Sequence, residues 1–175
     1  ANPVLSIRKE GNTLAWGAVY EQYFQEIDKV KGQKGVLSVE KKLFVETNNG
    51  TNRQIRPVTP EQPLRIGDKV IVRLTIRTDR EMNYVFLKDL RAGCFEPADQ
   101  LSGPESRDGI WYYRSPKDVS ENFFINRLPE GAFVLEYPVY VSRSGEYAGG
   151  ISTIQCMYAP EFVSHTAGES LRIMP

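Results

Sequence analysis

The sequence has few of the residues on which metal sites and most hydrolases depend. It holds one histidine and two cysteines among 175 residues. A structural zinc site needs four ligands, mostly cysteine and histidine, so this set is too small for one. A Ser-His-Asp site needs a histidine held by a carboxylate and aimed at a nucleophile, whereas His165 only follows Ser164 in a polar stretch. We therefore predict no metal, no cofactor and no enzymatic activity, and an ordinary surface position for His165.

Other features are missing as well. The 22 basic residues are balanced by 22 acidic ones, which argues against a nucleic-acid-binding protein. No apolar run approaches the roughly 20 residues that span a bilayer, so no membrane span is predicted. No signal-like segment opens the chain, and its abrupt start at Ala1 is typical of a mature or trimmed fragment.

The two cysteines, Cys94 and Cys156, lack the C-x-x-C spacing of metal or redox sites. Two alternatives stay open for them. They are either buried free thiols or, in an oxidising compartment, a disulfide. A bridge would close a loop of about 60 residues and stabilise the fold by roughly 4 kcal/mol in the chain-entropy model.

Apolar and polar residues alternate over much of the chain, which is the period of a half-buried strand. One run carries its apolar residues at Val70, Val72, Leu74 and Ile76, and a second at Phe133, Leu135, Tyr137, Val139 and Val141. A third run has Leu37, Val39, Leu43 and Val45 around an interruption at Lys41. Such runs indicate antiparallel sheets with one face buried.

Turn residues separate these runs, notably at 48–50, 67–68, 129–131 and 144–145, and residues 98–109 form the longest polar loop. Many short strands with regular turns predict an all-β antiparallel β-sandwich with at most one short helical turn. The expected strands cover residues 3–9, 13–24, 36–47, 53–58, 68–78, 82–90, 110–114, 119–126, 132–142, 150–158 and 169–174.

Residues 14–27 fit two periods. Trp16, Tyr20 and Phe24 satisfy alternation, and together with Val19, Tyr23 and Ile27 they also satisfy helical spacing. The aromatic content favours a strand. The charged stretch 25–35, with two glycines, is expected to be an exposed connection and the one domain boundary.

Three aromatic residues in a row, Trp111, Tyr112 and Tyr113, are a candidate contact surface. Alternation places Trp111 and Tyr113 on one face of a strand and Tyr112 on the other. Two interpretations stay open. The aromatics of one face pack in the core, or the trio is a contact surface that stacks on sugar rings or fills a pocket of a protein partner.

Three stretches, in order, carry a family resemblance. They are residues 64–77 (LRIGDKVIVRLTIR) with 82–89 (MNYVFLKD), residues 127–137 (RLPEGAFVLEY) and residues 154–162 (IQCMYAPEF). Together they resemble the C-terminal macroglobulin-like domain of bacterial alpha-2-macroglobulins, in the spelling of the Bacteroidetes branch. The resemblance assigns residues 36–175 to a macroglobulin-type, immunoglobulin-like sandwich and residues 1–35 to linker strands from the preceding module.

This resemblance implies a non-catalytic interaction domain within a periplasmic or cell-envelope protein that traps proteases. Its partners are then the upstream domains of the same polypeptide and, through the full-length protein, proteases. Many relatives carry a Cys-x-Glu-Gln thioester in an upstream domain, and a Met-Tyr pair on the last domain keeps water from it. The matching pair here is Met157 and Tyr158. A carbohydrate-binding sandwich that uses Trp111 and Tyr112 is the alternative.

The chain departs from the family at residues 90–97 (LRAGCFEP), where a proline is lost and Cys94 is gained. A bridge from Cys94 to Cys156 would tie this loop to the strand that bears Met157 and Tyr158. The departure leaves open whether this branch still guards a thioester.

Overall fold

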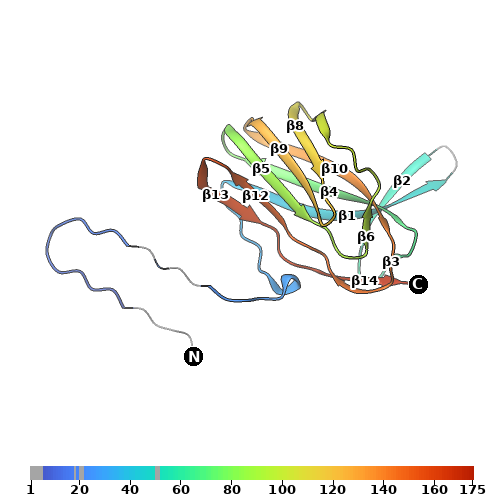
Figure 1. Ribbon diagram of the computed structural model, residues 1–175, viewed down its shortest axis with the longest axis horizontal. Helices are drawn as coiled ribbons and strands as arrows, with labels where there is room; N and C mark the ends of the chain where they lie inside the picture. Colours follow the sequence, from blue (N-terminus) through green and yellow to red (C-terminus); the bar gives the residue numbers. More distant parts are fainter. Residues whose placement is uncertain (1–5, 18, 20–21, 50–51) are drawn as a thin grey trace.

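Antiparallel strands build two facing sheets in the computed structural model, which describes residues 6–17, 19, 22–49 and 52–175 (Figure 1). One sheet has five strands, in the order β2 (Asn52–Pro57), β1 (Leu37–Asn49), β4 (Lys69–Thr78), β10 (Gly131–Val141) and β6 (Phe95–Pro97). The other has six, in the order β13 (Ala159–His165), β12 (Ser152–Cys156), β5 (Met82–Leu90), β9 (Ser120–Leu128), β8 (Ile110–Pro116) and β7 (Gly103–Arg107). The predicted all-β antiparallel sandwich is confirmed.

A small third sheet lies at one end of the sandwich and contains the last strand. Its order is β11 (Gly145–Ala148), β14 (Ser170–Met174) and β3 (Leu64–Arg65), with β14 parallel to β3. Within the described residues the single helical element is the 3-10 turn η1 (Ile27–Lys29). None of the described residues forms a helix long and apolar enough to cross a membrane.

Most expected strands form near their expected bounds, and the strand expected over 82–90 is β5 itself. The alternation did not indicate β3, β6, β7, β11 and β13. The polar loop expected over 98–109 is wrong in part, because Gly103–Arg107 form β7 and pair with β8. This strand has no buried residue, so it lacks the apolar alternation that marks a strand in a sequence. The turn expected at 48–50 extends beyond the described residues.

The N-terminal segment is not a strand in its described part. Strands were expected over 3–9 and 13–24. This prediction is wrong for the described residues of both ranges, because they form no regular structure. Residues 3–5, 18 and 20–21 lie outside the described residues. Figure 1 shows this segment running away from the sandwich. Alternation forms a strand only where a neighbouring strand completes the hydrogen bonds, and Trp16 and Phe24 stay fully exposed.

The connection into β1 is exposed but fixed to the sandwich. Gln33 and His165 exchange two backbone hydrogen bonds of 2.9 and 3.0 Å, and the amide of Gly168 donates to the carbonyl of Val30 at 2.8 Å. Gly168 has no room for a side chain, because a Cβ there would overlap the carbonyl oxygen of Ile27. The chain therefore leaves the sandwich from a defined position along the edge strand β13.

Side chains from both sheets fill one core between them. The ring of Phe123 on β9 lies 6.2 Å from that of Tyr137 on β10 and 5.7 Å from that of Tyr112 on β8. The inward-facing residues of the predicted runs on β4 and β10 are buried as expected: Val70, Val72, Leu74, Ile76, Phe133, Leu135, Tyr137, Val139 and Val141. Full burial of each such side chain stabilises the fold by roughly 1.5–3 kcal/mol.

The sequence pattern indicated an interruption at Lys41, but β1 continues through this residue. Lys41 pairs with Leu74 in the middle of the strand and faces inward, where its Nζ lies 2.8 Å from Asp89 Oδ1 on β5. The same ammonium donates to the carbonyls of Leu90 and Gly149, at 2.9 and 3.2 Å. A charged side chain can occupy a core position when it is paired and hydrogen-bonded in this way.

Cys94 and Cys156 are both buried, free thiols. Of the two alternatives that the sequence left open, the structure therefore has the free thiols and not the disulfide. Cys156 pairs across the sheet with Val85, whereas Cys94 follows the far end of β5 at Leu90. Five strand residues separate those two positions by about 16 Å, beyond the reach of a disulfide. The Cys156 thiol donates instead to the carbonyl of Asn83 at 3.1 Å.

Candidate functional site

Met157 and Tyr158 form the turn between β12 and β13. The register of this hairpin shifts between Gln155 and Cys156, so the strand ends before the pair. Both side chains point to solvent, with 52% of Met157 and 79% of Tyr158 exposed. The pair therefore lies at an exposed end of the sheet and not within a strand.

The turn rests on Tyr84 of β5. The amide of Met157 donates to the carbonyl of Tyr84 at 2.9 Å. The rings of Tyr84 and Tyr158 meet edge to face, with centroids 5.2 Å apart and planes at 84°. Such a pair contributes about 0.5–1.5 kcal/mol beyond the area it buries. The exposed turn is therefore held in one position by a backbone bond and an aromatic contact.

Tyr84 reaches this position through an unusual backbone conformation. Its φ is +55°, in the left-handed region that bulky residues rarely occupy. Regular alternation would point Tyr84 into the core beside Met82. The positive φ breaks the alternation, so Met82 and Val85 are both buried and Tyr84 faces outward. A residue held in this region costs about 1–2 kcal/mol, which the surrounding strands must offset.

A row of directly paired residues continues from this region across the outer face of the six-stranded sheet. Its members, from β13 to β7, are Val163, Gln155, Phe86, Phe124, Tyr113 and Pro104. The rings of Phe86 and Phe124 stack with centroids 4.9 Å apart. No member of the row is charged. We call the outer side that carries Tyr158, Tyr84, Phe86, Phe124, Tyr113 and Trp111 the aromatic face.

The predicted division of the three consecutive aromatics is found in the structure. Tyr112 is buried and donates to Glu105 Oε2 at 2.9 Å, while Trp111 and Tyr113 are 71% and 47% exposed. The sequence did not predict that Tyr84, Phe86 and Phe124 belong to the aromatic face. The alternation of β5 and β9 gave a signal for the two phenylalanines, but only the register of the two strands brings them together.

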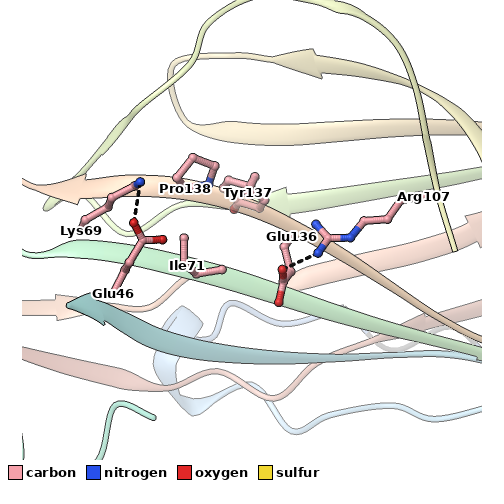
Figure 2. A pocket seen from close by; sticks show the side chains of 7 residues that line it. All are labelled: Glu46, Lys69, Ile71, Arg107, Glu136, Tyr137 and Pro138. Carbon is pink, nitrogen blue, oxygen red and sulfur yellow. Dashed lines mark hydrogen bonds and ion pairs between the residues drawn. The ribbon is translucent and has the colours of Figure 1, made fainter. Parts of the chain in front are cut away.

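The outer face of the five-stranded sheet is chemically different. A hollow of about 370 Å³ lies on it, and two ion pairs line this hollow, Lys69 with Glu46 at 2.8 Å and Arg107 with Glu136 at 2.6 Å. Figure 2 shows both pairs among the lining side chains. Partial burial raises the pKa of the Glu136 carboxyl, but hydrogen bonds from Arg73 and Arg107 outweigh it and hold the pKa below its usual range. Glu136 is then ionised at neutral pH and cannot donate a proton as a general acid.

His165 and Ser164 are not arranged as a nucleophile and its base. The carbonyl oxygen of Thr166 accepts a hydrogen bond from His165 Nδ1 at 3.1 Å, and the neighbouring Ser164 is fully buried. Among the residues that the structure describes, no group of three or more histidine, cysteine, aspartate or glutamate side chains is suited to a metal ion. The aromatic face is therefore the candidate site, and its chemistry is that of contact rather than bond-breaking.

Comparison with known proteins gives a family model, solved structures and a curated relative. Residues 37–161 match a family model described as "Bacterial Alpha-2-macroglobulin MG10 domain". The fold superimposes on Salmonella alpha-2-macroglobulin reacted with methylamine, with a TM-score of 0.64 and 21% identity, over 83% of this chain and 10% of that chain. Native alpha-2-macroglobulin from Escherichia coli, spanning domain MG7 to the C-terminus, gives a TM-score of 0.63 and 16% identity, over 82% of this chain and 24% of that chain.

A curated relative, "Circularly permutated Ras protein 2" of Dictyostelium discoideum, is 28% identical over 109 residues. That match covers 62% of this chain and 3% of the relative. The chain thus spans a small part of each protein that it matches.

Proposed function

The chain belongs to the bacterial alpha-2-macroglobulin MG10 domain family, and on this basis we propose that it is a non-catalytic interaction domain of a protease-trapping protein of the bacterial envelope. In this proposal residues 36–175 form the domain and residues 1–35 link it to a preceding one. The domain packs against other domains of the same polypeptide, and its contact is centred on Met157 and Tyr158.

The observation that carries this proposal is the fixed, exposed turn at Met157 and Tyr158. Two large, mostly apolar side chains are presented to solvent, yet Tyr84 holds their backbone in place. A surface ordered before it binds loses less entropy on association. An exposed apolar turn with this support is typical of a docking contact rather than of a flexible loop.

The same turn is suited to shield a thioester in an adjoining domain. A thioether and an aromatic ring exclude water from an acyl group and are themselves poor nucleophiles toward it. The proposal is that Tyr158, 79% exposed here, covers such a group in the assembled protein. Protease cleavage would then separate the two surfaces and admit water or an attacking amine.

Hydrogen exchange tests the packing. We expect the Met157 and Tyr158 region to exchange more slowly in the full-length polypeptide than in the 175-residue chain. Tyr158→Ala in the full-length polypeptide should remove most of that protection. Equal exchange in the two proteins would contradict the packing.

Thiol release tests the shielding. If a thioester is covered, Tyr158→Ala should speed the appearance of a titratable thiol roughly tenfold or more, the loss expected for one buried aromatic anchor. Tyr140→Ala, an exposed aromatic on the other sheet, is the matched control. An unchanged rate in Tyr158→Ala would limit the turn to packing.

A further inference from the structure

The turn and Trp111 lie on one continuous surface, although the sequence presents them as separate candidates. Tyr84 supports Tyr158 and is followed two residues later by Phe86, which pairs with Phe124. Phe124 pairs in turn with Tyr113 on β8. The aromatic face therefore runs from the β12–β13 turn across β5 and β9 to the far side of the sheet.

The composition of this face differs from that of the row beside it and from that of the outer face of the other sheet. The next row of paired residues on the same side of the sheet is polar: Thr153, Lys88, Asn122 and Ser115. The outer face of the other sheet carries the ion pairs of Glu136 with Arg73 and Arg107, both 2.6 Å long. An apolar strip with a polar border is the arrangement found in protein–protein interfaces. Exposed apolar patches of this kind mark interaction sites.

The size and chemistry of the strip favour a protein over a sugar as the occupant. Six strands spaced about 4.8 Å apart make it about 24 Å long. A sugar needs several hydrogen-bonding groups beside its stacking ring. Across its six positions the strip offers two, the amide of Gln155 and the hydroxyl of Tyr113, and no charged group.

Resting on the proposed function, we infer that the docking contact extends beyond the turn over the whole aromatic face as far as Trp111, and that its partner is an apolar surface of another domain of the same polypeptide. The chain spans 10% of the Salmonella protein and 24% of the Escherichia coli fragment, so most of such a polypeptide lies outside it. Trp111, 71% exposed here, becomes buried in the assembled protein. Tryptophan is among the residue types that most often dominate the affinity of an interface.

Side-chain oxidation by hydroxyl radicals tests this directly, because Met, Trp and Tyr all react. The rates for Met157, Tyr158, Trp111 and Tyr113 are compared between the 175-residue chain and the full-length polypeptide. Tyr140 on β10 is the matched internal control, since it is 45% exposed and Tyr113 is 47% exposed. We expect all four rates to fall in the full-length polypeptide while the rate for Tyr140 is unchanged.

Each outcome bears on one claim. Protection of Met157 and Tyr158 without protection of Trp111 and Tyr113 overturns the inference and leaves the proposed function standing. Protection of none of the four removes both. If Trp111 is protected in the 175-residue chain and this protection is lost on dilution, the face binds a second copy of the chain. If added oligosaccharides protect Trp111, the face binds a sugar. Either result overturns the inference.

A variant completes the test. Trp111→Ser in the full-length polypeptide should raise the oxidation rate of Tyr113 and Tyr158 together, by roughly tenfold if Trp111 is a dominant contact. Tyr140→Ser, which removes a comparable exposed ring from the opposite sheet, should leave both rates unchanged. If Trp111→Ser frees neither residue, the contact does not extend to β8.

Discussion

Lys41 and Asp89 join the two sheets through a buried ion pair, with Lys41 Nζ 2.8 Å from Asp89 Oδ1. Asp89 is fully buried and also accepts hydrogen bonds from Ser152 Oγ at 2.7 Å and from the hydroxyl of Tyr137. The carboxylate thus collects donors from both sheets at one point in the core. Removing one partner of such a group leaves the others uncompensated.

Lys41→Met is expected to lower the free energy of unfolding by about 3–5 kcal/mol, because it leaves Asp89 charged and buried without its cation. Urea unfolding measures this. Lys42→Met is the matched control: Lys42 is the next residue of β1, it faces outward, and it forms an ion pair with exposed Glu40. We expect its effect to be below about 1 kcal/mol. Equal effects of the two substitutions would show that the buried pair adds nothing.

Tyr84→Gly should loosen the turn at Met157 and Tyr158 without unfolding the sheet. Glycine adopts the φ of +55° at no steric cost, so the backbone strain is relieved while the ring contact with Tyr158 is lost. The Met157 amide is expected to exchange faster with solvent. Tyr84→Phe keeps the ring and should exchange like the wild type; faster exchange in that variant as well would assign the support to the hydroxyl group instead.

Gly168→Ala should release the connection before β1, since a Cβ at this position would overlap the carbonyl oxygen of Ile27. Trypsin cleavage at Lys29, Lys31 and Lys34 is expected to become faster, with little change in the stability of the core. Gly103→Ala is the control, because nothing lies within 4 Å of a Cβ at that glycine. An unchanged cleavage pattern in Gly168→Ala would show that the connection is not fixed to the sandwich.

The thiols give a prediction about oxidation state. Burial raises the pKa of the Cys94 thiol to about 11, so the reactive thiolate is scarce at neutral pH. We expect native protein to react slowly with iodoacetamide, and denatured, unreduced protein to show two titratable thiols. Finding none after denaturation would demonstrate the Cys94–Cys156 bridge that the structure lacks.

Glu136 gives a prediction about pH. Its folded-state pKa is lowered, because the hydrogen bonds from Arg73 and Arg107 outweigh its partial burial. The ionised carboxyl therefore stabilises the folded state above the pKa of glutamate in the unfolded chain, and this contribution is lost as the pH falls through the lower folded pKa. Glu136→Gln should lower stability by roughly 1 kcal/mol at pH 7 and by progressively less below pH 4. Exposed Glu130→Gln is the control; a Glu136→Gln effect that persists in acid would mean that charge is not its cause.

Local patterns in the sequence were sufficient for the sheets but not for the site. Period-two runs predicted β4, β5 and β10, and alternation correctly separated Tyr112 from Trp111 and Tyr113. These features depend only on neighbours along the chain. The family resemblance, rather than any pattern, identified Met157 and Tyr158.

The rest depends on contacts between distant residues. The positive φ of Tyr84 has no local signal, because tyrosine almost never adopts it unless the surrounding fold imposes it. The stacking of Phe86 on Phe124 requires the register of β5 against β9. Lys41 was interpreted as a break because its buried partner, Asp89, lies 48 residues away in the chain. The segment with Trp16 shows the converse, since a strand pattern without a neighbouring strand stays irregular.

The two hydrogen bonds between Gln33 and His165 have a consequence for solubility. β13 is the edge of its sheet, and unpaired main-chain groups on an edge recruit strands from other molecules. The connection pairs with one end of this edge, at His165, and so shortens the stretch that is open to another strand. A mechanical pull on the chain before β1 would break the hydrogen bonds between Gln33 and His165. This end of β13 would then be open to pairing with a strand of another molecule, and the protein would be more prone to aggregate.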